Sequence, residues 1–463
     1  VELAAARTKL LPPVQLLGRL EQALPLLTAG RRDAPERQRT LRATIAWSFH
    51  LLTPHEQDLF RRLSVFAGSF DLTAAERICD AELDTLQSLL EKNLVRRWES
   101  GRFGMLETIH EYAGGRLEES GDAERVRDRH AAYFLELAES AGLAADVDLP
   151  QRHDLVIPEA SNLRAALDWA GSTGRLELAA RLAVALENFW VTNNPVEGMR
   201  RIEALLREPD DLPPLLRART LRASASCTFL LGERDVAQRT LEESLAIFRD
   251  LGDDHGIAVI LHRLAVAAMV RGEREQAAAL GEESLALHRA SGSRKGEAQA
   301  LALLGSLAWE QGHRERALEL LAESAELARA VGFRWWEAGM LVQIAWHNLE
   351  LRRPDEAARA ARDALSIRKG IGDRPGTVLV LAVAAGAAAV AGRWTTAGRL
   401  WGAVEAERAR GEAVVGWQPE DDAFFAELII DRAGSGFEDA RAAGRSLAFE
   451  AAVEEAEEAL AAH

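Results

Sequence analysis

The sequence has almost no cysteine. Its 463 residues include two cysteines, Cys79 and Cys227, which lie far apart and match no metal-ligand spacing. A disulfide framework and a zinc motif are therefore excluded, and the composition favours a reducing compartment. We expect a cytoplasmic protein without a metal site.

Lysine is also scarce, and the motifs of common active sites are missing. None of the four lysines stands in a G-x-x-x-x-G-K-[ST] phosphate loop. His110 and Glu111 begin no zinc-protease motif, because Gly114 stands where the second histidine belongs. No G-x-S-x-G motif occurs. We therefore expect no catalytic residue and no cofactor in this chain, which is predicted not to be an enzyme.

Long apolar runs are absent as well. The uncharged stretch at residues 376–392 is rich in Ala and Gly and is shorter than the ~20 residues of a membrane span. No basic segment leads into an apolar run at the start, so no secretory signal is visible. Val1 stands where a complete chain would have Met, which indicates a fragment of a longer protein. No membrane association is expected.

Positive charge is lacking in the larger part of the chain. Residues 1–130 hold 19 Lys and Arg against 20 Asp and Glu, whereas the remainder holds 37 against 52. Because an acidic surface repels phosphate backbones, the part after residue 130 is a poor candidate for binding nucleic acid.

What the chain does have is a 40-residue repeat. Glycines stand at positions 232, 272, 312 and 392, with Arg352 at the skipped position, and a second series stands at 252, 292, 332 and 372. Alanines follow the first series five residues later, and small residues recur at positions 225, 265, 305, 345 and 385. Each unit contains two segments with the apolar spacing of amphipathic helices, such as those starting at Ile257 and Glu275. Glycine between them permits the left-handed conformation that ends a helix.

These marks resemble the tetratricopeptide repeat, although 40 residues exceed that family's usual 34. The resemblance implies a right-handed superhelix of stacked helix pairs, whose first helices line a concave wall. Projected onto that wall, nine residues form a candidate groove for a protein or peptide partner, or for a small-molecule inducer. They are Arg219, Arg222, Phe229, His262, Met269, Trp309, Glu310, Trp346 and Glu350. The alternative for the tryptophans is that they fill gaps between successive pairs.

The first 155 residues have a different pattern. Thr53, Pro54 and Glu56 form a capping box at a helix start, and Thr73 with Glu76 repeats the device. A third amphipathic helix, "LDTLQSLLEKNL", precedes two short predicted strands, 95–98 and 102–105. Three helices and a hairpin predict a winged-helix domain.

A winged helix raises the possibility of DNA binding. The basic residues of the wing, Arg96, Arg97 and Arg102, suit either phosphate contacts or an interdomain contact. The third helix, which would enter the major groove, carries Glu91 and more acid than base. Direct DNA binding is therefore not favoured.

Longer segments resemble the signal-transduction ATPases with numerous domains (STAND), in particular actinobacterial regulators. These segments include "TLRATIAWSFHLLTPHEQDLFRRLSVFAGSFDLTAAERIC", "RFGMLETIHEYA" and "IPEASNLRAALDWA". The resemblance implies an upstream nucleotide-binding domain that holds ATP or ADP in the full-length protein. The family's ADP-sensing histidine is replaced by Leu106, and His110, one turn later, is the candidate substitute.

The expected fold class is all-α, with one small β-hairpin and a tetratricopeptide-like solenoid. Five domains are expected: a remnant helical subdomain at 1–38, a winged helix at 39–120, a linker helix at 121–155, the solenoid at 156–410 and capping helices at 411–463. The predicted function is the regulatory and sensor region of a STAND-type transcriptional regulator. A scaffold without switching and a DNA-binding regulator acting through the winged helix remain the alternatives.

Overall fold

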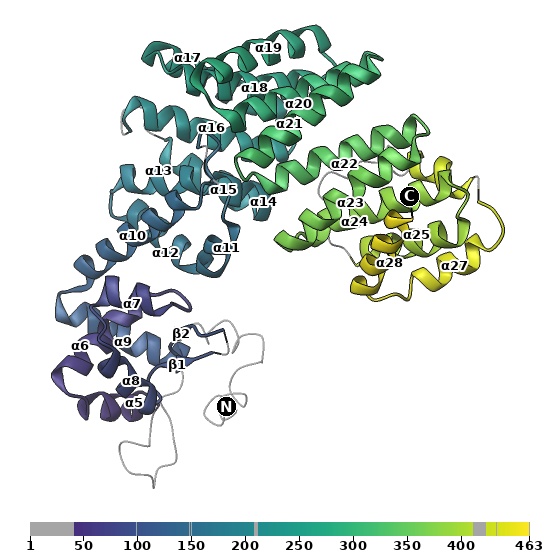
Figure 1. Ribbon diagram of the computed structural model, residues 1–463. Helices are drawn as coiled ribbons and strands as arrows, with labels where there is room; N and C mark the ends of the chain where they lie inside the picture. The colour runs from purple at the N-terminus through teal and green to yellow at the C-terminus, as the bar shows by residue number, and fades with distance from the viewer. Residues whose placement is uncertain are drawn as a thin grey trace, which may run out of the picture. The chain divides into compact units, whose positions relative to one another are not determined.

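The computed structural model describes residues 41–98, 100–147, 149, 151–207, 212–410, 423–431 and 433–462. The predicted remnant at 1–38 lies outside these residues. Residues Val1–Ala145 and Arg152–Glu233 form one compact unit, and residues Asp146–Gln151 and Arg234–His463 form a second. The predicted fold class is confirmed, because repeated helix pairs and one small hairpin make up the described residues (Figure 1).

The first unit begins with a group of short helices around a hairpin. The elements are α5 (Leu41–His50), α6 (Pro54–Arg62), η2 (Leu63–Val65), α7 (Leu72–Cys79), α8 (Leu83–Glu91), β1 (Arg96–Arg97), β2 (Phe103–Gly104) and α9 (Glu107–Ser120). The capping box before α6 is confirmed: the Thr53 amide donates to Glu56 at 2.8 Å, and the Glu56 amide donates to the Thr53 hydroxyl. The second predicted cap is wrong. Asp71 caps α7 by accepting from the Ala74 amide at 2.7 Å, because the helix begins at Leu72, ahead of Thr73.

The hairpin joins a third extended residue. Arg96 faces Gly104 and Arg97 faces Phe103 in the antiparallel pair β1–β2. Phe70, which precedes α7, exchanges two backbone hydrogen bonds of 2.8 Å with Phe103. The hairpin is therefore tied to the start of α7.

The rest of the first unit is helical. Its elements are α10 (Ala123–Ser140), α11 (His153–Val156), η3 (Ile157–Glu159), α12 (Ala160–Ser172), α13 (Leu176–Ala185), α14 (Glu187–Asn193), α15 (Pro195–Leu205) and α16 (Pro214–Leu230). One continuous apolar core runs from Ile45 on α5 to Cys227 on α16. The hairpin region and these helices therefore fold as one body.

The second unit contains the regular repeats. Its helices are α17 (Arg234–Leu251), α18 (Asp254–Val270), α19 (Arg274–Ser291), α20 (Arg294–Glu310), α21 (Arg314–Ala330), α22 (Arg334–Glu350), α23 (Pro354–Ile371), α24 (Arg374–Val390) and α25 (Trp394–Ala409). Each helix packs on the next, and the pairs α18–α19, α20–α21 and α22–α23 have the most extensive contacts (Figure 1).

The turns of the repeat adopt the predicted backbone conformation. Gly272 (φ +78°) and Gly312 (φ +84°), which end first helices, and Gly292 (φ +72°), which ends a second helix, are all left-handed. Arg352 occupies the position where the series lacks glycine, and its φ is +56°. The geometry of the repeat thus imposes a positive φ on Arg352, although residues with a Cβ atom prefer negative φ.

Buried serines join the two helices of a repeat. The Ser284 hydroxyl donates to the Ala258 carbonyl at 2.8 Å, and 40 residues later Ser324 donates to Ala298 at 2.7 Å. Both serines are fully buried. Neutral hydrogen bonds of this kind fix the register of one helix against the other without burying charge.

Side-chain sizes are complementary between the second helix of one repeat and the first helix of the next. A Cβ on Gly256 would lie 2.2 Å from the Phe248 ring, and a Cβ on Gly296 would lie 2.2 Å from His288. One repeat later the large residue is on the other helix, because Ala328 stands in the position of His288 and Trp336 in that of Gly296. A small residue on one helix thus faces a large one on its neighbour in both cases.

The C-terminal helices cover the last repeat. They are η4 (Ala426–Ile430, one turn of π-helix), α27 (Phe437–Gly444) and α28 (Phe449–Ala461). A Cβ on Gly402 of α25 would lie 2.1 Å from the Arg441 carbonyl, so glycine permits α25 and α27 to approach closely. The described part of 411–463 packs on α24 and α25, and its capping role stays a prediction.

Candidate functional site

The three wing arginines have different environments. Arg96 and Arg97 are exposed. Arg102 donates to the Ser69 hydroxyl at 2.7 Å and to the Ser69 carbonyl at 2.9 Å, and it pairs with Glu159 at 2.5 Å. Glu159 is only 4% exposed. Arg102 therefore anchors the hairpin to η3, which favours the interdomain contact over a phosphate contact.

Asn162 completes this anchor and was missed by sequence reasoning. Its amide nitrogen donates to the Ser69 carbonyl at 2.9 Å and to Glu159 at 2.8 Å, and its oxygen accepts from the Ala67 amide at 2.9 Å. The side chain is 1% exposed. The segment "IPEASNL" thus carries an acid and an amide that hold the hairpin region on α12.

His110 has a structural partner. Its Nε2 lies 2.9 Å from the Phe66 carbonyl. A carbonyl oxygen only accepts, so Nε2 carries the proton and donates. This bond ties α9 to the residue that follows η2, and a role of His110 in nucleotide sensing stays a prediction.

Arg222 was predicted to line the groove, and this is wrong. The side chain is fully buried in the first unit, where it donates to Glu187 Oε2 at 2.9 and 3.1 Å. Ser226 donates to the other carboxylate oxygen at 2.9 Å. The helix α16 is enclosed on the side that the repeat pattern assigned to solvent. Arg219 and Phe229 are partly exposed.

Trp309 was predicted to be an exposed anchor, and this is wrong as well. The side chain is 9% exposed. Its ring stacks on His347 of the next repeat, with 3.6 Å between the centroids and 14° between the planes. The Arg314 guanidinium lies 4.1 Å from the Trp309 ring. The alternative that tryptophan fills a gap between successive pairs therefore holds for this residue.

Trp346 is half-buried and has aromatic neighbours. Its ring lies 5.0 Å from that of Phe424 and 4.6 Å from that of Phe425. Residues after α25 thus pack on this tryptophan, which contributes to the core of the second unit.

The remaining groove candidates keep some exposure. Glu310 is exposed and pairs with Arg274 at 2.9 Å, and Glu350 is exposed beside His347. Met269 is half-buried. Burial lowers the pKa of His262 to about 3, so this imidazole is neutral at physiological pH. A binding role for these residues stays a prediction.

Lys295 and His255, which were not predicted as site residues, contact the backbone of Asp146 and Val147. Lys295 Nζ donates to the Val147 carbonyl at 2.9 Å, and His255 Nε2 lies 3.0 Å from the Asp146 carbonyl. Asp146 and Val147 belong to the second unit together with the repeats. One signal was available, because lysine is rare and Lys295 occupies the repeat position of His255 exactly one period later.

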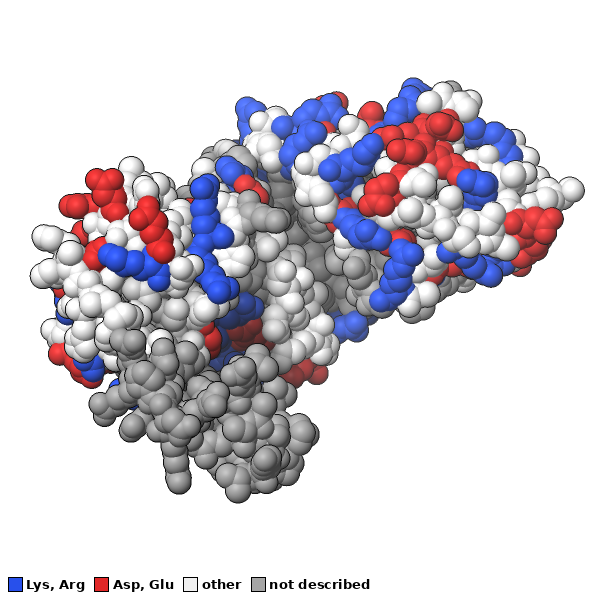
Figure 2. Space-filling view, turned by 90° about the horizontal axis from the view of Figure 1, so that it is seen from below, with Lys and Arg blue, Asp and Glu red and all other residues white. Residues whose placement is uncertain are grey.

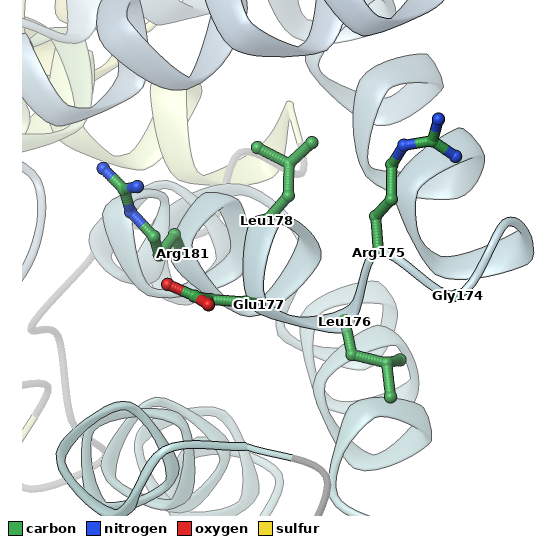
Figure 3. Close-up of a pocket in the computed structure, with 6 residues that line it drawn as sticks. All are labelled: Gly174, Arg175, Leu176, Glu177, Leu178 and Arg181. Atoms are coloured by element: carbon green, nitrogen blue, oxygen red, sulfur yellow. The ribbon is translucent and has the colours of Figure 1, made fainter. Parts of the chain in front are cut away.

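Two pockets are lined by described residues of a single unit. One, of about 490 Å³, lies at the start of α13 and is formed by residues Gly174–Leu178 and Arg181. Figure 3 shows Arg175 and Arg181 on either side of Leu178. Both arginines are paired with carboxylates of α10, Arg175 with Asp128 at 2.9 Å and Arg181 with Glu139 at 2.7 Å. This pocket therefore has no unshared cation for an anionic ligand among its lining residues.

The second pocket, of about 390 Å³, lies between the α23–α24 turn and α28. Arg374 lies over the Phe449 ring at 4.0 Å and pairs with Glu407 at 2.7 Å. Burial lowers the pKa of the Arg368 guanidinium, and the bond to Asp373 opposes this shift. The arginines that line this pocket are thus paired with carboxylates of the same unit, which suits a structural role.

Charges of both signs are interspersed on the face shown in Figure 2.

Within the described residues no three His, Cys, Asp or Glu side chains are grouped as a metal site requires. None of the helices in this part of the chain is long and apolar enough to cross a membrane.

No protein-family model matches the chain. A Mycobacterium tuberculosis protein named "Putative HTH-type transcriptional regulator Rv0890c" is 34% identical over 272 residues, which cover 55% of this chain and 31% of that protein. "Uncharacterized protein Rv0894" of the same strain is 36% identical over 146 residues, which cover 29% of this chain and 37% of that protein. The chain thus spans about a third of the length of the curated relatives it matches. The relatives are mycobacterial, in agreement with the actinobacterial resemblance.

Among solved structures, the STAND protein PH0952 of Pyrococcus horikoshii, which has a tetratricopeptide repeat sensor, is 14% identical with a TM-score of 0.49. The comparison covers 99% of this chain and 73% of that one. Aspartyl phosphate phosphatase F of Bacillus subtilis is 13% identical with a TM-score of 0.47, over 92% of this chain and 96% of that one.

Proposed function

We propose that this chain is the regulatory region of a STAND-type transcriptional regulator. The helix repeats of the second unit bind a protein or peptide partner, or a small-molecule inducer. The first unit relays this binding to a nucleotide-binding domain that precedes Val1 in the full-length protein. ATP or ADP is bound there, and the chain itself performs no catalysis.

One observation carries this proposal: an uninterrupted series of 40-residue helix pairs in a chain whose relative is named as a transcriptional regulator. A stack of helix pairs buries a continuous core and leaves a long surface, which suits binding better than chemistry. Because this sequence contains no phosphate loop, our proposal places the nucleotide in another part of the full-length protein.

The pairing of Arg102 supports a relay in preference to DNA binding by the wing. Its bonds to Ser69 and Glu159 couple the hairpin to the helices that follow. Neutralising a phosphate would require Arg102 to leave a nearly buried carboxylate. That exchange is unfavourable, because an unpaired buried charge is costly.

The experiment is to express the protein from its natural start codon and titrate it with a fluorescent ATP analogue. We expect a G-x-x-x-x-G-K-[ST] motif upstream of Val1, and we expect substitution of its lysine to abolish nucleotide binding. A natural chain without that motif and without nucleotide binding would contradict the switch. A plain scaffold for partner proteins would then be the better description.

A further inference from the structure

Asp146 and Val147 belong to the same unit as the helix repeats, although Ala145 belongs to the first unit. His255 contacts the carbonyl of Asp146, and Lys295 donates to the carbonyl of Val147. These donors are 109 and 148 residues away in sequence. The repeats therefore hold these two residues partly through their backbone.

The two donors occupy equivalent places. His255 is the second residue of α18, and Lys295 is the second residue of α20, one repeat later. Trp335 is the second residue of α22, and it is 42% exposed. Successive repeats thus present a histidine, a lysine and an exposed tryptophan at the same position of the first helix.

The position of Lys295 in the first turn of α20 is unfavourable for a lysine for two local reasons. The first turn of a helix carries the positive end of the helix dipole, which repels a cation. The residue is also 3% exposed, and burial disfavours an ammonium group. The partners that offset these costs include the Val147 carbonyl and the face of the Phe333 ring, 5.4 Å from Nζ. The contacts of its ammonium group with the Val147 carbonyl and the Phe333 ring therefore help to stabilise a lysine in this position.

The partner that fits this surface is a peptide in a non-helical conformation. Backbone carbonyls exist in every peptide, so His255 and Lys295 recognise the main chain without reading its sequence. The cation favours acidic neighbours, and the exposed ring of Trp335 favours apolar ones. The sequence at residues 146–151, Asp-Val-Asp-Leu-Pro-Gln, alternates acidic and apolar residues at its start.

We infer that the first turns of α18, α20 and α22 form a binding site for an acidic and aliphatic peptide. In this structure Asp146 and Val147 of the chain itself contact the site, and a partner peptide displaces them. This inference rests on the proposed binding role of the repeats and is independent of the nucleotide switch.

The internal occupant is suited to displacement. Asp146 and Val147 are half-buried, and Leu149 is 47% exposed, so these described residues cover little apolar surface. A tethered segment competes with an effective concentration in the millimolar range. A partner therefore succeeds by adding contacts, for which Trp335 is available at the next repeat.

The test uses a fluorescein-labelled peptide with the sequence of residues 145–151 and measures its anisotropy with the whole chain. In one variant, Gly and Ser replace residues 146–151. We expect this variant to bind the peptide at least about tenfold more tightly than the unmodified chain, because the tethered competitor has been removed. Equal affinity for the two chains, or no binding by the variant at about 1 mM peptide, would overturn the inference.

Substitution of the lysine tests the contact itself. In the chain with the replaced segment, Lys295→Met should weaken peptide binding about tenfold or more, as expected for loss of a charged hydrogen bond. Lys369→Met is the matched control, because Lys369 is 46% exposed and pairs with Glu457 away from the segment. The same affinity in both variants would contradict the assignment.

If Lys295→Met fails to fold, as judged by circular dichroism, His255→Asn provides the second variant. Asparagine keeps a donor, but its amide nitrogen lies closer to Cα than histidine Nε2, and we expect a severalfold loss of peptide affinity. A failure of peptide binding together with an intact nucleotide response would overturn this inference alone and leave the proposed function standing.

Discussion

The buried pair of Arg222 and Glu187 gives the sharpest quantitative prediction. Arg222 is completely buried and donates twice to one carboxylate oxygen, at 2.9 and 3.1 Å, while Ser226 donates to the other at 2.9 Å. The Ala145 amide also donates to Glu187, at 3.3 Å. Arg222→Met removes the cation and leaves a 2% exposed carboxylate among neutral donors. Breaking a buried pair in this way costs about 3–5 kcal/mol.

The measurement is amide hydrogen exchange of peptides from α14 and α16, followed by mass spectrometry. A loss of about 3–5 kcal/mol accelerates exchange through unfolding by roughly two to three and a half powers of ten. The double variant Arg222→Met with Glu187→Leu should recover most of the loss, because a well-packed apolar pair replaces a buried ion pair at little cost. A single variant that loses less than about 1 kcal/mol would refute the reasoning.

Three further predictions concern the turns, the packing and the titration of single residues. Arg352→Gly should stabilise the chain by about 0.5–1 kcal/mol in urea unfolding, since φ is +56° there, whereas Gly312→Arg should destabilise it. Gly296→Ala should cost about 1–3 kcal/mol and lower the melting temperature, because its Cβ would lie 2.2 Å from His288. Burial lowers the pKa of His130 from 6.5 to about 4, so below pH 6.5 the unfolded chain binds a proton that the folded chain does not. Stability should therefore fall by about 3 kcal/mol between pH 6.5 and 4, and urea unfolding of His130→Phe should lack this part of the decrease.

Contrary results would be informative in each case. An unchanged unfolding midpoint for Arg352→Gly would mean that other contacts of the turn compensate for its left-handed conformation. The same pH profile for His130→Phe and the unmodified chain would mean that other groups control the loss of stability in acid.

The repeat was predictable because its information is local. A glycine with positive φ and an amphipathic period are fixed by a few neighbouring residues, and so α18 to α23 and their turns follow the prediction. Even Arg352 keeps the geometry of the series. The capping box at Thr53 is local in the same sense, whereas the cap at Thr73 failed because Asp71, two residues earlier, is the stronger acceptor.

The binding surface was not predictable from the period alone. A helix position tells which face a residue occupies, but it does not tell what covers that face. Trp309 is covered by His347, and Arg222 faces a carboxylate on α14. The contact between Lys295 and Val147 joins residues 148 positions apart, and no local pattern encodes it. Its trace in the sequence is the position of a rare lysine at the period of the repeat.

We propose that ligand binding by the helix repeats is coupled to the nucleotide state of the full-length protein. This coupling is measured as the affinity of the full-length protein for a fluorescent ADP analogue, with the segment at 146–151 either unmodified or replaced by Gly and Ser. Since coupling between two sites is a shared free energy, removal of the internal occupant should change the ADP affinity about fivefold or more. In a variant that binds the peptide, an ADP affinity identical to that of the unmodified protein would show that the repeats are not coupled to the nucleotide.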